Sequence, residues 1–279
     1  MLKGERCVQL FQPFFRLVVY LSASDKYVKN NNMKKTRFAC HLKIVLTVFA
    51  LVSFTLVSLA KNKILVFSKT AGYHHKSIDV GIKAIQDLGA KYHFDVDSTT
   101  DSTRFVYSNL KKYAAVIFLS TTGDVLNDEQ QKAFEQYIQS GGGFVGVHAA
   151  TDTEYGWPWF GKLVGAYFVK HPKIQEAVLV INDSTNIATK HLPHLWKRTD
   201  EWYNFKDIQS DLHVLISIDE TSYSGGTNGA NHPMAWYHNF DGGRAFYTEL
   251  GHTDESYSDP LYLQHLWGGL QYAMGKKVK

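Results

Sequence analysis

A histidine stands directly after one of the short apolar runs of this 279-residue chain, where a strand would end. The run Phe144–Val147 leads into His148, with Gly146 before it and Ala149 and Ala150 after it. Small neighbours favour a sharp turn that presents one exposed side chain at the edge of a sheet, as in a nucleophile elbow. An imidazole there would serve as a general base or a metal ligand. A turn histidine bonded to the backbone is the plainer alternative.

Other polar groups stand at places where strands should end or begin. His74-His75 follow the first apolar run, Asp200-Glu201 lie among aromatic residues, and His252 follows Gly251. The carboxyl ends of parallel strands share one edge of a sheet, and ligands bind there. We therefore expect four side chains to converge on one cleft: His75, His148, Glu201 and His252. Each group alone also has a purely structural explanation: His74-His75 as helix-cap residues, Asp200-Glu201 as part of an amphipathic strand, and His252 as part of a polar loop.

Both cysteines, Cys7 and Cys40, lie within the first sixty residues, so residues 61–279 contain no thiol. This part of the chain therefore has no thiolate nucleophile, no disulfide and no cysteine-based metal site. Its chemistry must come from histidines, carboxylates and other oxygen or nitrogen groups. A divalent metal held by histidines and a carboxylate is one reading of these residues, and acid–base chemistry without a cofactor is the other.

The candidate residues must be positioned by strands and helices, which the apolar pattern after Lys61 predicts. Short runs at 64–67, 93–96, 114–119 and 144–147 alternate with helical patterns at 77–88 and 127–139; Gly89 should end the first helix. This rhythm predicts an α/β fold, a mostly parallel sheet with helices on both faces. Runs at 177–181, 214–218, 234–240 and 244–248 predict an antiparallel extension that ends in a hairpin. A helix over 260–274 closes the single domain expected for residues 61–279.

The first sixty residues read as a leader. Residues 44–59 are sixteen uncharged positions; Lys34, Lys35, Arg37 and Lys43 precede them, and Ser58-Leu59-Ala60 ends the segment. This order predicts a secretory signal that begins at Met33, with residues 1–32 arising from an upstream start codon. The apolar run is shorter than the roughly 20 residues of a spanning helix, although an uncleaved membrane anchor is the alternative. We expect an exported protein, periplasmic or extracellular.

Charge also separates the two parts. Residues 1–60 hold nine Lys and Arg but two Asp and Glu, whereas the remainder holds 21 basic and 24 acidic residues. The part after the leader has a net charge of −3 and no basic tract, so no nucleic-acid partner is expected. Contact with a membrane is expected only through the signal segment. The sequence leaves the oligomeric state open.

Together these stretches resemble the ThuA-like (trehalose-utilisation) family over about residues 62–276. The matching pieces are 69–78, 142–152, 200–203, 232–237 and 242–253. The resemblance implies a flavodoxin-like fold related to class I glutamine amidotransferases, in which the elbow residue is a cysteine. His148 stands at that position here, so glutaminase chemistry is excluded. Where the family pattern has a His-Pro after the middle strand, this chain has Asn186-Ile187, and no role carries over to that histidine.

The resemblance further implies carbohydrate metabolism, with trehalose, related sugars or keto-sugar intermediates as substrates. The expected partner is therefore a small sugar or glycoside. Catalytic roles are expected for His148, His75, Glu201 and His252. Substrate contacts are expected from Asp152, Asp200, Tyr203, His232, Trp236 and Arg244.

The reaction type stays open among elimination, isomerisation and hydrolysis, by acid–base or metal-assisted chemistry. Arg244 would be available to polarise a carbonyl group. Hydrolysis by two carboxylates is less favoured, because neighbours on a strand such as Asp200 and Glu201 point in opposite directions. A non-catalytic carbohydrate-binding module is the alternative from another class.

The leader generates the first prediction. Because the small residues Ser58 and Ala60 end the apolar run, cleavage is expected after Ala60, and the exported protein should begin at Lys61. Mass spectrometry of the protein recovered from the cell envelope or medium measures this N-terminus. An intact leader on the recovered protein would show a membrane anchor instead.

Overall fold

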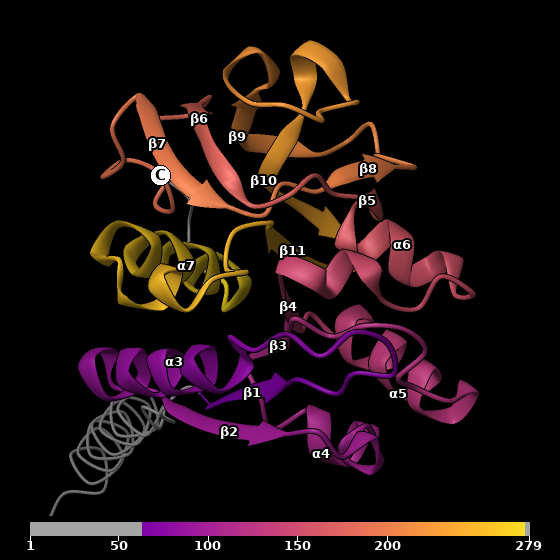
Figure 1. Ribbon diagram of the computed structural model, residues 1–279. Helices are drawn as coiled ribbons and strands as arrows, with labels where there is room; N and C mark the ends of the chain where they lie inside the picture. Colours follow the sequence, from indigo (N-terminus) through magenta and orange to yellow (C-terminus); the bar gives the residue numbers. More distant parts are fainter. Residues whose placement is uncertain (1–62, 277–279) are drawn as a thin grey trace, which may run out of the picture. The chain divides into compact units, whose positions relative to one another are not determined.

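The computed structural model describes residues 63–276, and the predicted leader and signal segment lie outside the described residues. Figure 1 shows a single large sheet flanked by helices. No helix within 63–276 is long and apolar enough to cross a membrane.

One half of the sheet is parallel, as predicted. Its strands lie in the order β2-β1-β3-β4-β11, and every neighbouring pair runs parallel. Three of the five, β1, β3 and β4, read as nearly continuous apolar runs because helices cover both faces of the sheet. The bounds are β1 (Lys63–Phe67), β2 (Asp95–Thr99), β3 (Ala115–Leu119), β4 (Gly143–Val147) and β11 (Gly243–Thr248).

The other half is the predicted antiparallel extension. From β11 the sheet continues as β10-β9-β6-β7, with each pair antiparallel. Asp241 and Gly242 both have positive φ and join β10 to β11 in a two-residue hairpin loop, which confirms the predicted hairpin. The bounds are β6 (Gln175–Ile181), β7 (Leu195–Asp200), β9 (His213–Asp219) and β10 (Pro233–Phe240); β5 (Tyr167–Lys170) and β8 (Asn204–Lys206) form a separate pair.

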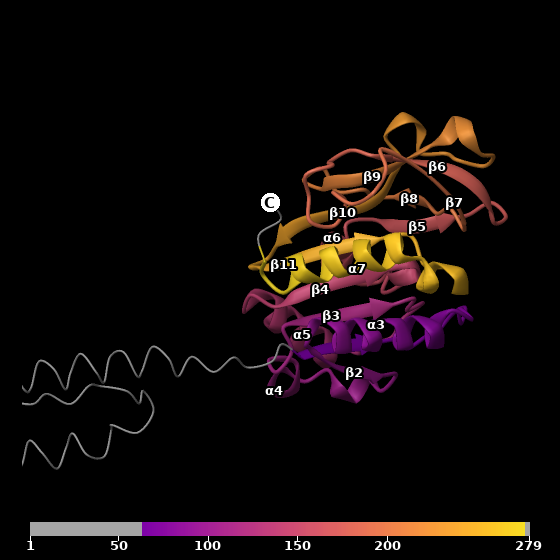
Figure 2. The same ribbon diagram turned by 90° about the vertical axis from the view of Figure 1, so that its left-hand side faces the viewer.

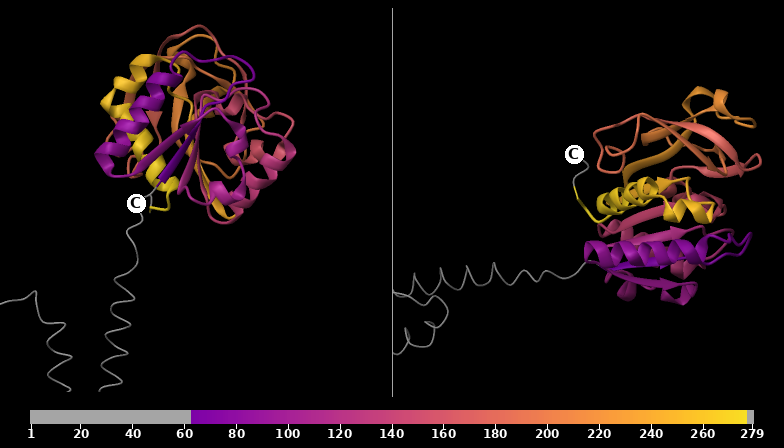
Figure 3. Two further views of the ribbon diagram at one scale, coloured as in Figure 1. Left: turned by 90° about the horizontal axis from the view of Figure 1, so that it is seen from below. Right: turned by 60° about the vertical axis from the view of Figure 1, so that its left-hand side comes forward.

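Helices cover both faces of the sheet, as the views in Figures 2 and 3 show. On one face lie α3 (Ile78–Tyr92) and α7 (Pro260–Ala273); on the other lie α4 (Tyr107–Leu110), α5 (Asp128–Gln139) and α6 (Pro158–Val164). The predicted start of α5 is confirmed: Asn127 and Gln130 form a capping box. The described residues also form five short 3-10 helices: η1 (Ser102–Arg104), η2 (His148–Asp152), η3 (Glu220–Ser222), η4 (Gly229–Asn231) and η5 (Asp254–Ser258).

Two local predictions are wrong. Gly89 does not end the first helix, which continues to Tyr92 and ends at His93 in the left-handed conformation. A β-carbon on Gly89 would lie 2.8 Å from the Phe94 carbonyl oxygen, so this glycine allows the chain to pack closely against its own helix. The second strand begins at Asp95 and not at His93.

The position of α7 depends on a fully buried histidine. The ring of His265 lies with Nδ1 2.9 Å from the Ala188 carbonyl oxygen and Nε2 3.1 Å from the Thr248 hydroxyl. Burial lowers the pKa of His265 to about 3, so the ring is neutral in the folded protein.

This burial predicts an acid-dependent loss of stability. The folded pKa lies below the unfolded value, so unfolding takes up a proton and stability falls as the pH decreases from about 6.5 towards 3. His265→Gln should flatten the slope of unfolding free energy in this window by about 1.4 kcal/mol per pH unit. Urea titrations at several pH values measure the slope. The exposed control His194→Gln should keep the original slope; equal slopes for wild type and His265→Gln would contradict the argument.

Candidate active site

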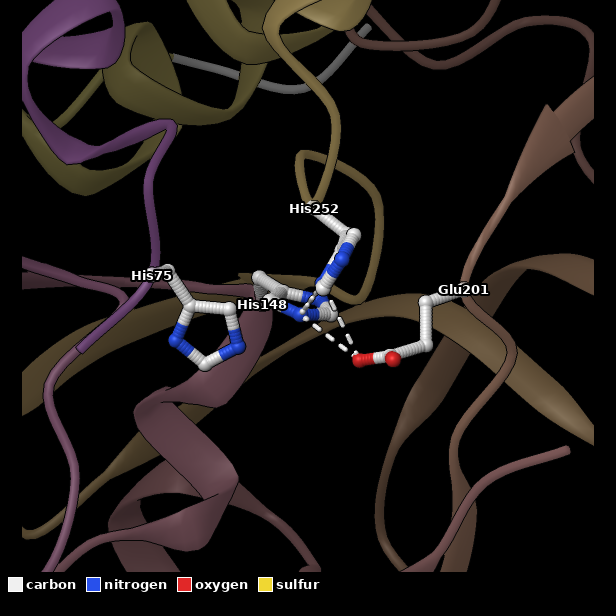
Figure 4. Close-up of side chains that lie close together, drawn as sticks. All are labelled: His75, His148, Glu201 and His252. Carbon is white, nitrogen blue, oxygen red and sulfur yellow. Dashed lines mark hydrogen bonds and ion pairs between the residues drawn. The ribbon is translucent and has the colours of Figure 1, made fainter. Parts of the chain in front are cut away.

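The four residues predicted to be catalytic lie together at the carboxyl edge of the parallel strands. His75, His148, Glu201 and His252 each place one nitrogen or oxygen within 4.8 Å of the others, and Figure 4 shows them converging. His75 follows β1, His148 follows β4 and His252 follows β11, so three parallel strands deliver three histidines to one edge. Glu201 enters from the antiparallel half, directly after β7. We call these four residues the His–Glu centre; their catalytic role remains a prediction.

His148 sits at the predicted sharp turn, but it is not exposed. It has a left-handed φ of +50° and no solvent exposure, and η2 begins with it. The small neighbours are explained by packing: a β-carbon on Gly146 would lie 2.9 Å from the Tyr247 ring and 3.2 Å from Ala150. The strained backbone thus aims the ring inward, to the floor of the centre.

Hydrogen bonds fix the orientation of this ring. His148 Nδ1–H donates to the main-chain oxygen of Glu249, 2.8 Å away. The other nitrogen, Nε2, then faces His252 Nδ1 at 3.1 Å and Glu201 Oε2 at 3.4 Å. His252 Nδ1 also lies 3.0 Å from Glu201 Oε2. These three atoms, His148 Nε2, His252 Nδ1 and Glu201 Oε2, form a compact triangle. His148 and Glu201 are buried, whereas His252 is partly exposed.

The surroundings shift the pKa values of the groups in the centre in different directions. Burial, with His148 and His252 nearby, lowers the pKa of His75 to about 3, so this ring is neutral at pH 7. Burial alone would raise the pKa of Glu201, but hydrogen bonds to His148 and His252 hold it below its usual range. Burial would lower the pKa of His252, whereas its bond to Glu201 raises it. The centre therefore combines a carboxylate, that of Glu201, with a neutral imidazole, that of His75.

Two groups that adjoin the His–Glu centre, His171 and Glu249, were missed by the sequence analysis. His171, at the rim after β5, places Nδ1 2.9 Å from Glu201 Oε1, and its ring stacks at 5.9 Å on Tyr203. A His-Pro pair directly after a strand is the signal that could have found it. Glu249 is fully buried behind His148, and burial raises the pKa of its carboxyl well above the usual value. An acidic residue at the end of an apolar strand is the signal there.

Two predicted substrate residues adjoin the centre. The Tyr203 hydroxyl lies 3.5 Å from His75 Nε2, and the Tyr203 ring packs 4.4 Å from the His148 ring. Asp152 ends η2, the 3-10 helix that His148 begins, and accepts a 2.7 Å hydrogen bond from Tyr155. Burial raises the pKa of Asp152 against that bond.

Two others support the centre from behind, which corrects the prediction that they contact substrate. Asp200 is fully buried, and its carboxylate pairs with Arg198. The carboxylate also accepts hydrogen bonds from the Gly251 N–H and the Ser256 hydroxyl. Asp200 therefore anchors the loop that carries His252. Nearby, the Ser77 hydroxyl donates to the Gly251 carbonyl oxygen across 174 positions. His232 is also buried, held between Glu220 and the main-chain oxygen of Tyr203.

The prediction is wrong for Trp236 and Arg244. Trp236 is buried in the core, and its indole N–H donates to the Val164 carbonyl oxygen. Arg244 pairs with Gly143 at the amino end of β4, so about 13 Å of strand, at roughly 3.3 Å per residue, separates it from the level of Val147, the residue before His148. Its guanidinium bonds the carbonyl oxygens of Ala273 and Gly141. Arg244 therefore cannot polarise a carbonyl at the centre.

The supporting role of Asp200 predicts a large stability effect. Asp200→Ala removes the buried carboxylate that pairs with Arg198 and accepts from the Gly251 N–H, so we expect a loss of roughly 3 kcal/mol in unfolding free energy, as for one partner of a buried pair. Urea denaturation measures it. The matched control is Asp254→Ala, which removes a half-exposed partner 3.8 Å from Lys76 and should cost less than about 1 kcal/mol. If Asp200→Ala were nearly as stable as the wild type, Asp200 would not support the centre, and the prediction that it contacts substrate would stand again.

Comparison with known proteins agrees with this fold. A profile of the ThuA family, described as trehalose utilisation, matches residues 63–273. A ThuA-like protein from Bacteroides uniformis ATCC 8492 is 25% identical, with a TM-score of 0.66 over 78% of this chain and 93% of that one. A ThuA-like protein from Parabacteroides merdae ATCC 43184 is 22% identical, with a TM-score of 0.66 over 78% and 92%.

More distant likeness is confined to the fold. A β-galactosidase from Bacillus circulans sp. alkalophilus is 14% identical, with a TM-score of 0.52, and its matched part is 32% of its length. No curated protein matches the chain. The profile match covers well over half of the sequence and confirms the resemblance seen in its motifs. The chain belongs to the ThuA family.

Proposed function

We propose that this protein is a carbohydrate enzyme that removes a proton from the carbon beside the ketone of an oxidised sugar or glycoside. The observation that carries the proposal is the His–Glu centre, where three histidines and a carboxylate meet at the ligand-binding edge of the sheet. The family's description, trehalose utilisation, supports carbohydrate metabolism as the setting.

The reaction matches the groups at hand. A base takes the proton, the C–H electron pair forms a C=C bond, and the carbonyl oxygen gains the negative charge. The ketone moves if the former carbonyl carbon and its oxygen each take up a proton while the hydroxyl on the neighbouring carbon loses one and becomes the new carbonyl. An elimination is completed instead if the glycosidic oxygen leaves and takes a proton. Imidazoles and carboxylates are the groups that most often carry protons in such steps, and the centre supplies three imidazoles and one carboxylate.

Two other reactions have less support. Hydrolysis by paired carboxylates needs a second available acid, but the Asp200 carboxylate is fully buried in bonds to Arg198, Ser256 and Gly251. Glutaminase chemistry needs a thiol at the elbow, where His148 stands instead, and residues 41–279 contain no cysteine.

We also propose that the enzyme works after export, in the periplasm or outside the cell. This rests on the basic and apolar order of residues 34–60. A small sugar that has been oxidised to a ketone is a substrate that either compartment can hold.

Deuterium exchange tests the reaction directly. Incubated in D₂O with a ketone-bearing disaccharide, the protein should exchange the hydrogen beside the ketone, whether the reaction ends in isomerisation or elimination, and proton NMR follows the loss of that signal. Glu201→Gln should slow the exchange by about 10²-fold or more, because proton-transfer groups contribute this much. The exposed control His194→Ala should exchange at the wild-type rate.

The parent disaccharide without a ketone is the substrate control and should not exchange. Binding of the ketone-bearing sugar without any exchange would overturn the proposal and favour a carbohydrate-binding module.

A further inference from the structure

We propose that the His–Glu centre binds one divalent transition-metal ion of the zinc class, with His75, His148, Glu201 and His252 as its ligands. The inference deepens the proposed function, on which its catalytic meaning rests. The binding itself is argued from geometry alone.

The spacing of three atoms matches the edges of a metal coordination polyhedron. His148 Nε2, His252 Nδ1 and Glu201 Oε2 are separated by 3.1, 3.4 and 3.0 Å. Ligands bound to zinc at about 2.0–2.1 Å in a tetrahedron lie about 3.3 Å apart. The three atoms therefore surround a point at bonding distance from all of them. His75 brings the fourth ligand atom, within 4.8 Å of the others.

Outer hydrogen bonds turn the lone pairs towards that point. His148 Nδ1–H is committed to the Glu249 main-chain oxygen, which leaves the Nε2 lone pair facing inward. His171 binds Glu201 Oε1, which leaves Oε2 facing the histidines. A backbone carbonyl or a second polar group behind each ligand is the usual arrangement around protein-bound metals.

A network of hydrogen bonds explains the same atoms less well. His252 Nδ1 can carry one proton, yet it faces two acceptors, Glu201 Oε2 at 3.0 Å and His148 Nε2 at 3.1 Å. His75 is 3% exposed, its Nδ1 has no hydrogen-bond partner, and its Nε2 has only the Tyr203 hydroxyl at 3.5 Å. Burying so weakly bonded an imidazole is unfavourable. A bond from His75 to a metal would offset that cost.

The ligand types select the metal. Three imidazoles and one carboxylate suit zinc and its neighbours, whereas calcium and magnesium prefer sets of oxygen atoms. With one carboxylate, a divalent ion leaves a net positive charge at the centre. That charge would polarise a sugar carbonyl, a role for which Arg244 lies at the wrong end of the sheet.

Metal analysis and cobalt spectroscopy test the inference. The protein purified after growth with added zinc chloride should contain close to one zinc ion per chain. The wild-type protein loaded with cobalt(II) chloride should show the intense visible bands of a four-coordinate nitrogen and oxygen site. The cobalt measurement needs no variant, so it stands even if a ligand variant fails to fold.

Variants place the ion. His148→Ala, Glu201→Gln and His252→Ala should each lose the zinc and the rise in melting temperature that zinc produces. His171→Ala removes only an outer bond to Glu201 and should weaken zinc binding by about 10–100-fold. The exposed control His194→Ala should keep full zinc content.

The outcomes separate the two proposals. Absence of zinc and of cobalt bands from folded wild-type protein overturns the metal site, while deuterium exchange by that metal-free protein would leave the proposed function standing. One bound zinc without any exchange on ketone-bearing sugars supports the metal site and overturns the proposed function.

Discussion

The hydrogen bond from His148 Nδ1 to the Glu249 main-chain oxygen is the contact on which the site depends. It joins the end of β4 to the end of β11 and fixes which nitrogen of His148 faces the centre. The same glutamate accepts the Tyr203 N–H through its side chain, so the loop that carries Glu201 is held by the residue that orients His148. One residue thus aligns groups delivered by both halves of the sheet.

The sequence predicted those parts of the fold whose signals are local. Continuous apolar runs revealed β1, β3 and β4, and the closely spaced runs at 234–240 and 244–248 revealed the hairpin, because each signal depends on neighbouring residues. β7 was missed because its inward positions include the charged Arg198, which is acceptable inside only through its pairs with Asp200 and Asp259. Such partners are distant in sequence and leave no local pattern.

The candidate site was predicted in outline for the same reason. His75 and His148 follow apolar strands that a parallel sheet must bring to one edge, so their meeting could be foreseen. Aromatic and charged types alone could not separate Trp236, which packs in the core, from Tyr203, which lines the centre. Arg244 was misplaced because strand direction was ignored: it lies near the start of β11, whereas the His–Glu centre lies beyond the end of β11.

The bond between Ser77 and Gly251 spans 174 positions, and the groups of the centre, from His75 to His252, are spread slightly more widely along the chain. A chain that grows from its N-terminus cannot assemble this centre until residue 252 has been made, when the whole parallel half is already complete. Contacts of such long range slow folding, because much of the chain must be ordered before they form. The complete centre is therefore absent from every chain that stops before residue 252, a consequence of the topology alone.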